Sequence, residues 1–150
     1  MTAEIRYQRI IRETPEAVFD AFTSPGGQLA FYGQDDPDWI VQSDSDLRVG
    51  GAWTIHFGPS REQLYRHRHV FIAIDRPRRL QLSTTETRLD GTTLRYETEL
   101  TFQAVDGGTL MTMTQRGLPT EQLRTEHARG VPNAFDRFEQ HLHDPAHRPT

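Results

Sequence analysis

Hydrophobic and polar residues alternate along most of this 150-residue chain, with the period of two that is typical of strands with one buried face. The alternation predicts strands near residues 4–12, 39–47, 51–58, 64–75, 79–88, 93–105 and 108–117. Residues 15–32 predict two short helices, and a longer helix is expected from about Thr120 to Leu142, with Thr120 as its N-cap. Hairpins in succession followed by a helix indicate a single α+β domain at residues 1–142, with a flexible tail at 143–150.

The turns predict which strand residues share a face, because residues directly opposite in an antiparallel pair point to the same side. A three-residue loop around Asp90-Gly91 puts Glu86 opposite Leu94 and Thr84 opposite Tyr96. A two-residue loop in the turn at 106–108 places these residues together on the buried face: Leu94, Tyr96, Thr98, Leu100, Phe102, Met111, Met113 and Gln115.

The strand at 64–75 is placed by the turns on its two sides. Through the turn at 76–78, Ile72 and Ile74 face Leu82 and Leu80, which carries Arg68 close to Glu86. Across the hairpin at 58–59, the apolar residues expected to share the inward face are Trp53, Ile55, Phe57, Leu64, Val70 and Ile72. The same register turns His67 and His69 outward.

The inward face is apolar except for a few side chains, namely Arg66, Arg68, Thr84, Glu86, Tyr96, Thr98 and Gln115. An uncompensated buried charge is costly, so Arg68 and Glu86 are expected to pair, to meet water or to meet a ligand. An apolar cavity with a few convergent polar groups is the usual description of a small-molecule site. Two alternatives stay open: Arg68 and Glu86 could form a surface pair at the rim, and the uncharged polar residues could form an internally satisfied network.

The terminal helix is expected to cover this face with a stripe at helical spacing, comprising Leu123, His127, Val131, Phe135, Phe138 and Leu142. His127 could donate to a ligand, act as a base, or simply be hydrogen-bonded. Pro132 is expected to kink the helix. The candidate cavity residues are Trp53, Ile55, Arg68, Val70, Thr84, Glu86, Tyr96, Thr98, Met113, Gln115, His127, Val131 and Phe135.

Several short motifs, in order, resemble those of the activator of heat shock protein 90 ATPase homologue (AHSA-type) family, in the START-like (SRPBCC) helix-grip superfamily. They are the segment 14–23, Phe31-Tyr32-Gly33 where relatives usually carry Trp-Trp-Gly, the Gly50-Gly51 pair, Pro77-Arg78-Arg79-Leu80, and Gly130 with Asp136-Arg137. The resemblance implies a curved antiparallel sheet of about six to seven strands gripping one long C-terminal helix, with two short helices after the first strand.

The resemblance also implies an apolar cavity between sheet and helix. Relatives commonly carry Trp where this chain has Val131, so the cavity here is expected to be larger. No single reaction is implied, because the fold hosts ligand carriers, cyclases, hydrolases and co-chaperone modules.

Composition narrows the function further. The net charge of −4 gives no basic field for nucleic acid, and no apolar run approaches the length of a membrane span. The absence of cysteine excludes disulfides and thiolate chemistry. The N-terminus shows no signal pattern, so a cytoplasmic location is expected. His67 and His69, with His56 beside them, could hold zinc, but in the predicted register they face outward without a supporting carboxylate, so no metal site is predicted.

The sequence therefore predicts a soluble START-like domain that binds a small, largely apolar molecule and needs no cofactor. One alternative is an enzyme of the polyketide cyclase/dehydratase or hydrolase type that uses Glu86, Tyr96 or His127 as acid or base. Another is a chaperone-interacting module similar to heat shock protein 90 ATPase activators. No catalytic residue is assigned, and a homodimer is left open.

Overall fold

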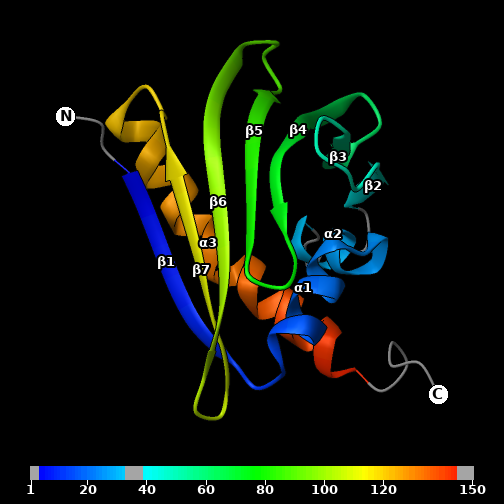
Figure 1. The fold of residues 1–150 in the computed structure, drawn as a ribbon. Coiled ribbons are helices and arrows are strands. Elements are labelled where there is room, and N and C mark those ends of the chain that lie inside the picture. The colour runs from blue at the N-terminus through cyan, green and yellow to red at the C-terminus, as the bar shows by residue number, and fades with distance from the viewer. Residues whose placement is uncertain (1–3, 33–38, 145–150) are drawn as a thin grey trace.

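The computed structural model describes residues 4–32 and 39–144, which form a curved antiparallel sheet around a long helix (Figure 1). In this part of the chain the sheet has seven strands: β1 (Glu4–Ile11), β2 (Ile40–Ser45), β3 (Ala52–Ser60), β4 (Gln63–Asp75), β5 (Arg79–Thr87), β6 (Thr93–Val105) and β7 (Gly108–Arg116). They pair in the order β1-β7-β6-β5-β4-β3-β2. The helices are α1 (Pro15–Thr23), α2 (Pro25–Tyr32) and α3 (Glu121–His143).

These elements confirm the expected α+β helix-grip fold. Helix α3 runs along one face of the sheet, and α1 and α2 lie together at one end of it (Figure 1). Thr120 is the N-cap of α3, as predicted, and its hydroxyl accepts the Leu123 amide at 3.1 Å. The helix continues through Pro132 to His143, and the expected kink stays a prediction. Gly33 and tail residues 145–150 lie outside the described residues.

The chain turns sharply at the two adjacent glycines before β3. Gly50 has φ of 82°, a left-handed conformation that glycine adopts without strain, and a side chain on Gly51 would collide with the carbonyl of Asp46. The loop thereby pairs with β4, with the Gly50 amide 2.8 Å from the carbonyl of Phe71. This close backbone approach is the role expected for two adjacent glycines.

The predicted registers of β5, β6 and β7 are confirmed. Glu86 lies opposite Leu94, and Thr84 lies opposite Tyr96. Thr98 is opposite Gln115, and the remaining pairs of the last hairpin follow in step. Alternating residues of β6 are buried, while Glu97 and Arg116 are exposed. One face of this part of the sheet is therefore largely apolar and covered, and the other is mainly polar and carries charged residues such as Glu97 and Arg116.

The predicted register of β4 is wrong. The pairs next to the turn at 76–78 are as predicted, with Ile74 opposite Leu80. An irregularity between Phe71 and Ala73 then shifts the pairing of the preceding β4 residues with β5 by one residue. A second irregularity between Phe57 and Ser60 shifts the pairing with β3. A one-residue slip turns every side chain to the other face.

Between the two shifts the orientation of β4 is therefore the reverse of the predicted one. Phe71 is 1% exposed, whereas Ile72 is 47% exposed. His67 and His69 are buried, and Arg66 and Arg68 are exposed. Val70, expected in the cavity, is half-buried and alternates with His69 and Phe71 on the strand, so it points to the opposite face.

The main core lies between the helices and the concave face of the sheet. Its fully buried large side chains include Phe19, Trp53, Ile55, Phe71, Leu80, Leu82, Leu100, Phe102, Met111, Phe135 and Phe138. Phe22 joins the layers, because its ring lies edge-on to Trp53, at 6.0 Å between centroids, and to Phe138, at 5.6 Å. Phe57, expected to be buried, is half-buried.

Candidate functional site

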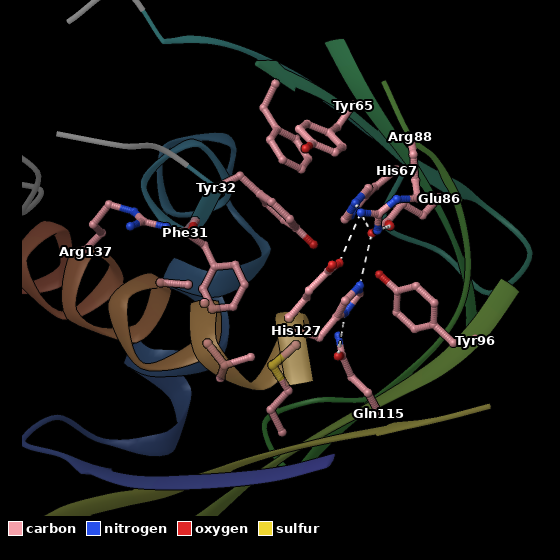
Figure 2. Close-up of a pocket in the computed structure, with 16 residues that line it drawn as sticks. Phe31, Tyr32, Tyr65, His67, Glu86, Arg88, Tyr96, Gln115, His127 and Arg137 are labelled. Carbon is pink, nitrogen blue, oxygen red and sulfur yellow. Dashed lines mark hydrogen bonds and ion pairs between the residues drawn. The ribbon is translucent and has the colours of Figure 1, made fainter. Parts of the chain in front are cut away.

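A cavity of about 270 Å³ lies between α3, the end of α2 and the concave face of the sheet (Figure 2). One side is apolar and aromatic, and the other carries convergent polar groups. The lining residues are Phe31, Tyr32, Phe57, Tyr65, His67, Glu86, Arg88, Tyr96, Met113, Gln115, Glu126, His127, Gly130, Val131, Ala134 and Arg137.

Glu86 is the centre of the polar side. It is 4% exposed, and its Oε1 lies 2.7 Å from Nε2 of His67 and 3.5 Å from Nε2 of His127. Its Oε2 lies 3.3 Å from Nη1 of Arg88. The hydroxyl of Tyr96 points toward the same carboxylate (Figure 2). The sheet places His67 directly opposite Glu86, whereas His127 reaches it from α3.

These contacts keep the carboxylate ionised. Burial by itself raises the pKa of Glu86, but the hydrogen bonds from His127 and His67 outweigh burial, and the pKa lies well below its usual range. Burial and the neighbouring negative charge act in the other direction on the phenols. The pKa of Tyr32 is raised by burial and by Glu86, and the pKa of Tyr96 is raised by burial, by Tyr32 and by Glu86. Both hydroxyls therefore keep their protons.

The two imidazoles beside Glu86 differ in their remaining contacts. Nδ1 of His127 lies 3.1 Å from Oε1 of Gln115, so both of its nitrogens face oxygen atoms. Nε2 of His67 donates to Glu86, and its Nδ1 is buried without a hydrogen-bond partner among the described residues. Such an unpaired polar atom is uncommon in a folded protein.

A second group of hydrogen-bonded polar side chains consists of His69, Thr84 and Tyr32, of which Tyr32 lines the cavity. His69 is hydrogen-bonded through Nδ1 to the hydroxyl of Thr84 at 2.7 Å and through Nε2 to the hydroxyl of Tyr32 at 3.1 Å. Burial, with a smaller contribution from His67, lowers the pKa of His69 well below its ordinary value, and Glu86 offsets part of this. His69 is thus neutral, and it fixes the orientation of the Tyr32 ring.

Two arginines line the cavity, and both donate hydrogen bonds to other groups of the protein. Arg88 donates to Oε2 of Glu126 on α3 at 3.1 Å as well as to Glu86, so it links the sheet to the helix. Arg137 donates to the backbone carbonyls of Ala30 and Phe31 at the end of α2. The Arg88 side chain remains 27% exposed.

Of the candidate cavity residues, six line the cavity: Glu86, Tyr96, Met113, Gln115, His127 and Val131. Trp53, Ile55 and Phe135 are part of the packed core instead. Thr84 and Thr98 are buried on the concave face but do not line the cavity. Arg68 is exposed on the outer face opposite Thr85, so neither the predicted contact nor a rim pair between Arg68 and Glu86 exists.

Sequence reasoning missed His67 and Tyr65, because the bulges were not recognised. A signal was available: rings occupy the odd positions Tyr65, His67, His69 and Phe71 of this strand, and arginines occupy positions 66 and 68. It also missed Arg88, Glu126, Ala134 and Arg137. Arg88 follows the last residue of β5, and Glu126 meets it only because α3 packs across the sheet.

Within residues 4–32 and 39–144, no group of three or more histidine, aspartate or glutamate side chains is arranged to hold a metal ion. The same residues contain no helix that is both long enough and apolar enough to cross a membrane.

The architecture and the cavity define a helix-grip domain of the START-like type. The chain belongs to the family described as "Activator of Hsp90 ATPase homolog 1-like protein", which matches residues 12–143. The resemblance noted in the sequence is thereby confirmed. No curated protein matches the chain significantly.

Solved structures agree on the fold. Protein CV1439 from Chromobacterium violaceum superposes with a TM-score of 0.80 at 19% identity, covering 94% of this chain and 97% of that one. A protein from Rhizobium leguminosarum has a TM-score of 0.78 at 18% identity, with 95% of both chains covered. An AHSA1-like protein from Aeromonas hydrophila has a TM-score of 0.72 at 22% identity, covering 99% of this chain and 97% of that one.

Proposed function

We propose that this chain binds one small, largely apolar molecule in the cavity between α3 and the sheet. The observation that carries the proposal is the lining itself. Phe31, Phe57, Met113, Val131 and Ala134 offer apolar surface, while polar groups converge on one side. This combination is the usual form of a small-molecule site. The volume of about 270 Å³ suits a single compact ligand.

The contacts of the polar groups favour binding over turnover. A carboxyl group whose pKa is lowered is a weak base and has no proton to donate at neutral pH, which describes Glu86. Both nitrogens of His127 already face protein oxygens, and Tyr96 holds its proton. These groups already have partners within the protein, so the alternative of an acid–base enzyme has less support.

The experiment is an amide NMR titration with 2-ethylnaphthalene, a compact apolar probe. We expect saturation at one probe per chain, with the largest shift changes at Met113, Gln115 and Val131. A titration that changes no shifts would overturn the proposal. So would changes concentrated at Leu47, Val49 and Ile72, which are exposed apolar residues outside the cavity.

A further inference from the structure

We infer that the ligand of this cavity is a neutral aromatic molecule that carries a carbonyl-type hydrogen-bond acceptor, and that Arg88 and Tyr65 hold this acceptor. The inference rests on the proposed binding function and adds the chemical class of the ligand. It combines three properties of the described lining: its rings, its unused hydrogen-bond donors and its charge balance.

The rings favour a flat ligand. The cavity is lined by aromatic or imidazole rings from five elements of the fold: Phe31, Tyr32, Phe57, Tyr65, His67, Tyr96 and His127. Phe57 and Tyr65 are stacked, with centroids 5.3 Å apart and planes inclined by 17°. The faces and edges of these rings attract a ligand most strongly when it is itself aromatic. The cavity volume of about 270 Å³ limits the size of such a ligand.

Besides Nδ1 of His67, two lining residues have hydrogen-bond donors that the described part of the protein does not use. Arg88 uses one N–H toward Glu86 and one toward Glu126, and a guanidinium carries further N–H donors with no acceptor of its own. The hydroxyl of Tyr65 has no hydrogen-bond partner within the part of the chain that the structure describes. Arg88 and Tyr65 line the same side of the cavity, from the end of β5 and from β4 (Figure 2). Their natural counterpart is an acceptor atom.

The charges favour a neutral acceptor over an anionic one. Arg88 forms ion pairs with Glu86 and with Glu126, so its positive charge is already compensated. A ligand carboxylate would add a negative charge beside these two and would lose its own hydration. A carbonyl oxygen accepts the same hydrogen bonds without that cost. A pure hydrocarbon would instead cover the donors and leave them unpaired.

Three probes with one ring system test this inference: 2-acetylnaphthalene, 2-ethylnaphthalene and 2-naphthoate, titrated calorimetrically. The wild type should bind the ketone about tenfold more tightly than the ethyl compound, the effect of one or two net hydrogen bonds, and should bind the carboxylate more weakly than the ketone. Tyr65→Phe removes only a hydroxyl, and the ratio of the affinities for the ketone and the ethyl compound should fall several-fold. Arg88→Met should abolish the preference. Arg95→Met, at an exposed position on β6 outside the cavity, is the control and should change nothing.

The outcomes separate this inference from the proposed function. If the ketone and the ethyl compound bind equally well to the wild type, the cavity binds ligands but the acceptor site is refuted. Tightest binding of 2-naphthoate would refute the neutral class of ligand. An unchanged preference in Tyr65→Phe, a substitution that preserves the ring, would refute the role of that hydroxyl even if Arg88→Met does not fold. If none of the probes binds, the proposed function itself fails.

Discussion

Nε2 of His67 on β4 lies 2.7 Å from Oε1 of Glu86, the residue directly opposite on β5, and both side chains are almost completely buried. The pair exists because, between its two irregularities, the side chains of β4 point to the faces opposite to those predicted. His67 therefore points toward the cavity and Arg68 away from it. An imidazole, rather than the expected guanidinium of Arg68, thus meets the buried carboxylate. Arg88 and His127 complete its environment from the end of β5 and from α3.

Replacing this carboxylate tests its structural contribution. Glu86→Gln keeps the volume but leaves His67 and Arg88 without their ionised acceptor, so the free energy of unfolding should fall by about 1–3 kcal/mol at neutral pH. Glu97→Gln, on the exposed face of β6, is the matched control and should stay within about 0.5 kcal/mol of the wild type. Urea denaturation measures both. Equal effects of the two substitutions would contradict the central position of Glu86.

The pKa shifts predict that acid destabilises the protein in two stages. The pKa of His69 is lowered from its ordinary 6.5, so below about that pH the unfolded chain binds a proton that the folded chain does not, and stability falls. The pKa of Glu86 is lowered from its ordinary 4.5, which adds a second loss below about that pH. Glu86 thus contributes a stabilisation that is present at higher pH and lost on acidification, whereas His69 adds a destabilisation that develops as the pH falls.

Thermal melting between about pH 8 and pH 3 measures this dependence. His69→Gln removes the first titration and should flatten the slope of Tm between about pH 6.5 and pH 5, whatever its effect on Tm itself. A wild-type Tm that is constant or rises on acidification from pH 7 to pH 5 would show that His69 does not resist protonation in the folded chain.

The side-chain orientation of β4, which is opposite to the predicted one, can be tested with two neighbouring apolar residues. Phe71→Ala should cost about 3–5 kcal/mol, the usual penalty for removing a buried ring. Ile72→Ala should cost less than about 1 kcal/mol, because Ile72 is 47% exposed. The alternation predicted from sequence, with Ile72 inward, demands the opposite ranking, and chemical denaturation of the two variants decides between them.

Phe138 anchors α3 to the sheet. It is 0% exposed and lies edge-on to Phe22 on α1. Phe138→Ala should therefore lower the free energy of unfolding by about 3–5 kcal/mol. A loss below about 1 kcal/mol in denaturant melts would show that the ring is not part of the core.

The size of the cavity depends on Val131, which lines it from α3 and is 8% exposed. Val131→Trp should fill part of the space and weaken binding of 2-ethylnaphthalene by at least about tenfold, because packed interiors do not readily accept added volume. Val49→Trp, at a site that is 62% exposed and outside the cavity, makes the same change as a control. Calorimetric titration of both variants gives the answer, and equal affinities would show that Val131 does not shape the site.

Local sequence signals were enough to predict the elements and the register of three of the seven described strands. Alternation predicted the strands, Thr120 predicted the start of α3, and the turns at 90–91 and 106–108 determined the register of β5, β6 and β7. In these hairpins the loop length specifies which residues pair, and no irregularity intervenes afterwards. Glu86, Tyr96 and Gln115 were therefore placed on the correct face from sequence alone.

Tertiary structure decided the rest of the site. The two irregularities, one between Phe57 and Ser60 and one between Phe71 and Ala73, involve backbone pairings of β4 with β3 and β5 that a local pattern does not reveal. A shift of one residue placed His67, instead of Arg68, at the buried carboxylate. The contacts of Glu86 with His127 and of Arg88 with Glu126 join residues about 40 positions apart, because α3 packs against the sheet there. Sequence by itself determined which side chains each strand can turn inward, and the packing of helix on sheet selected which of them meet, since buried charge is stable only where a partner from another element satisfies it.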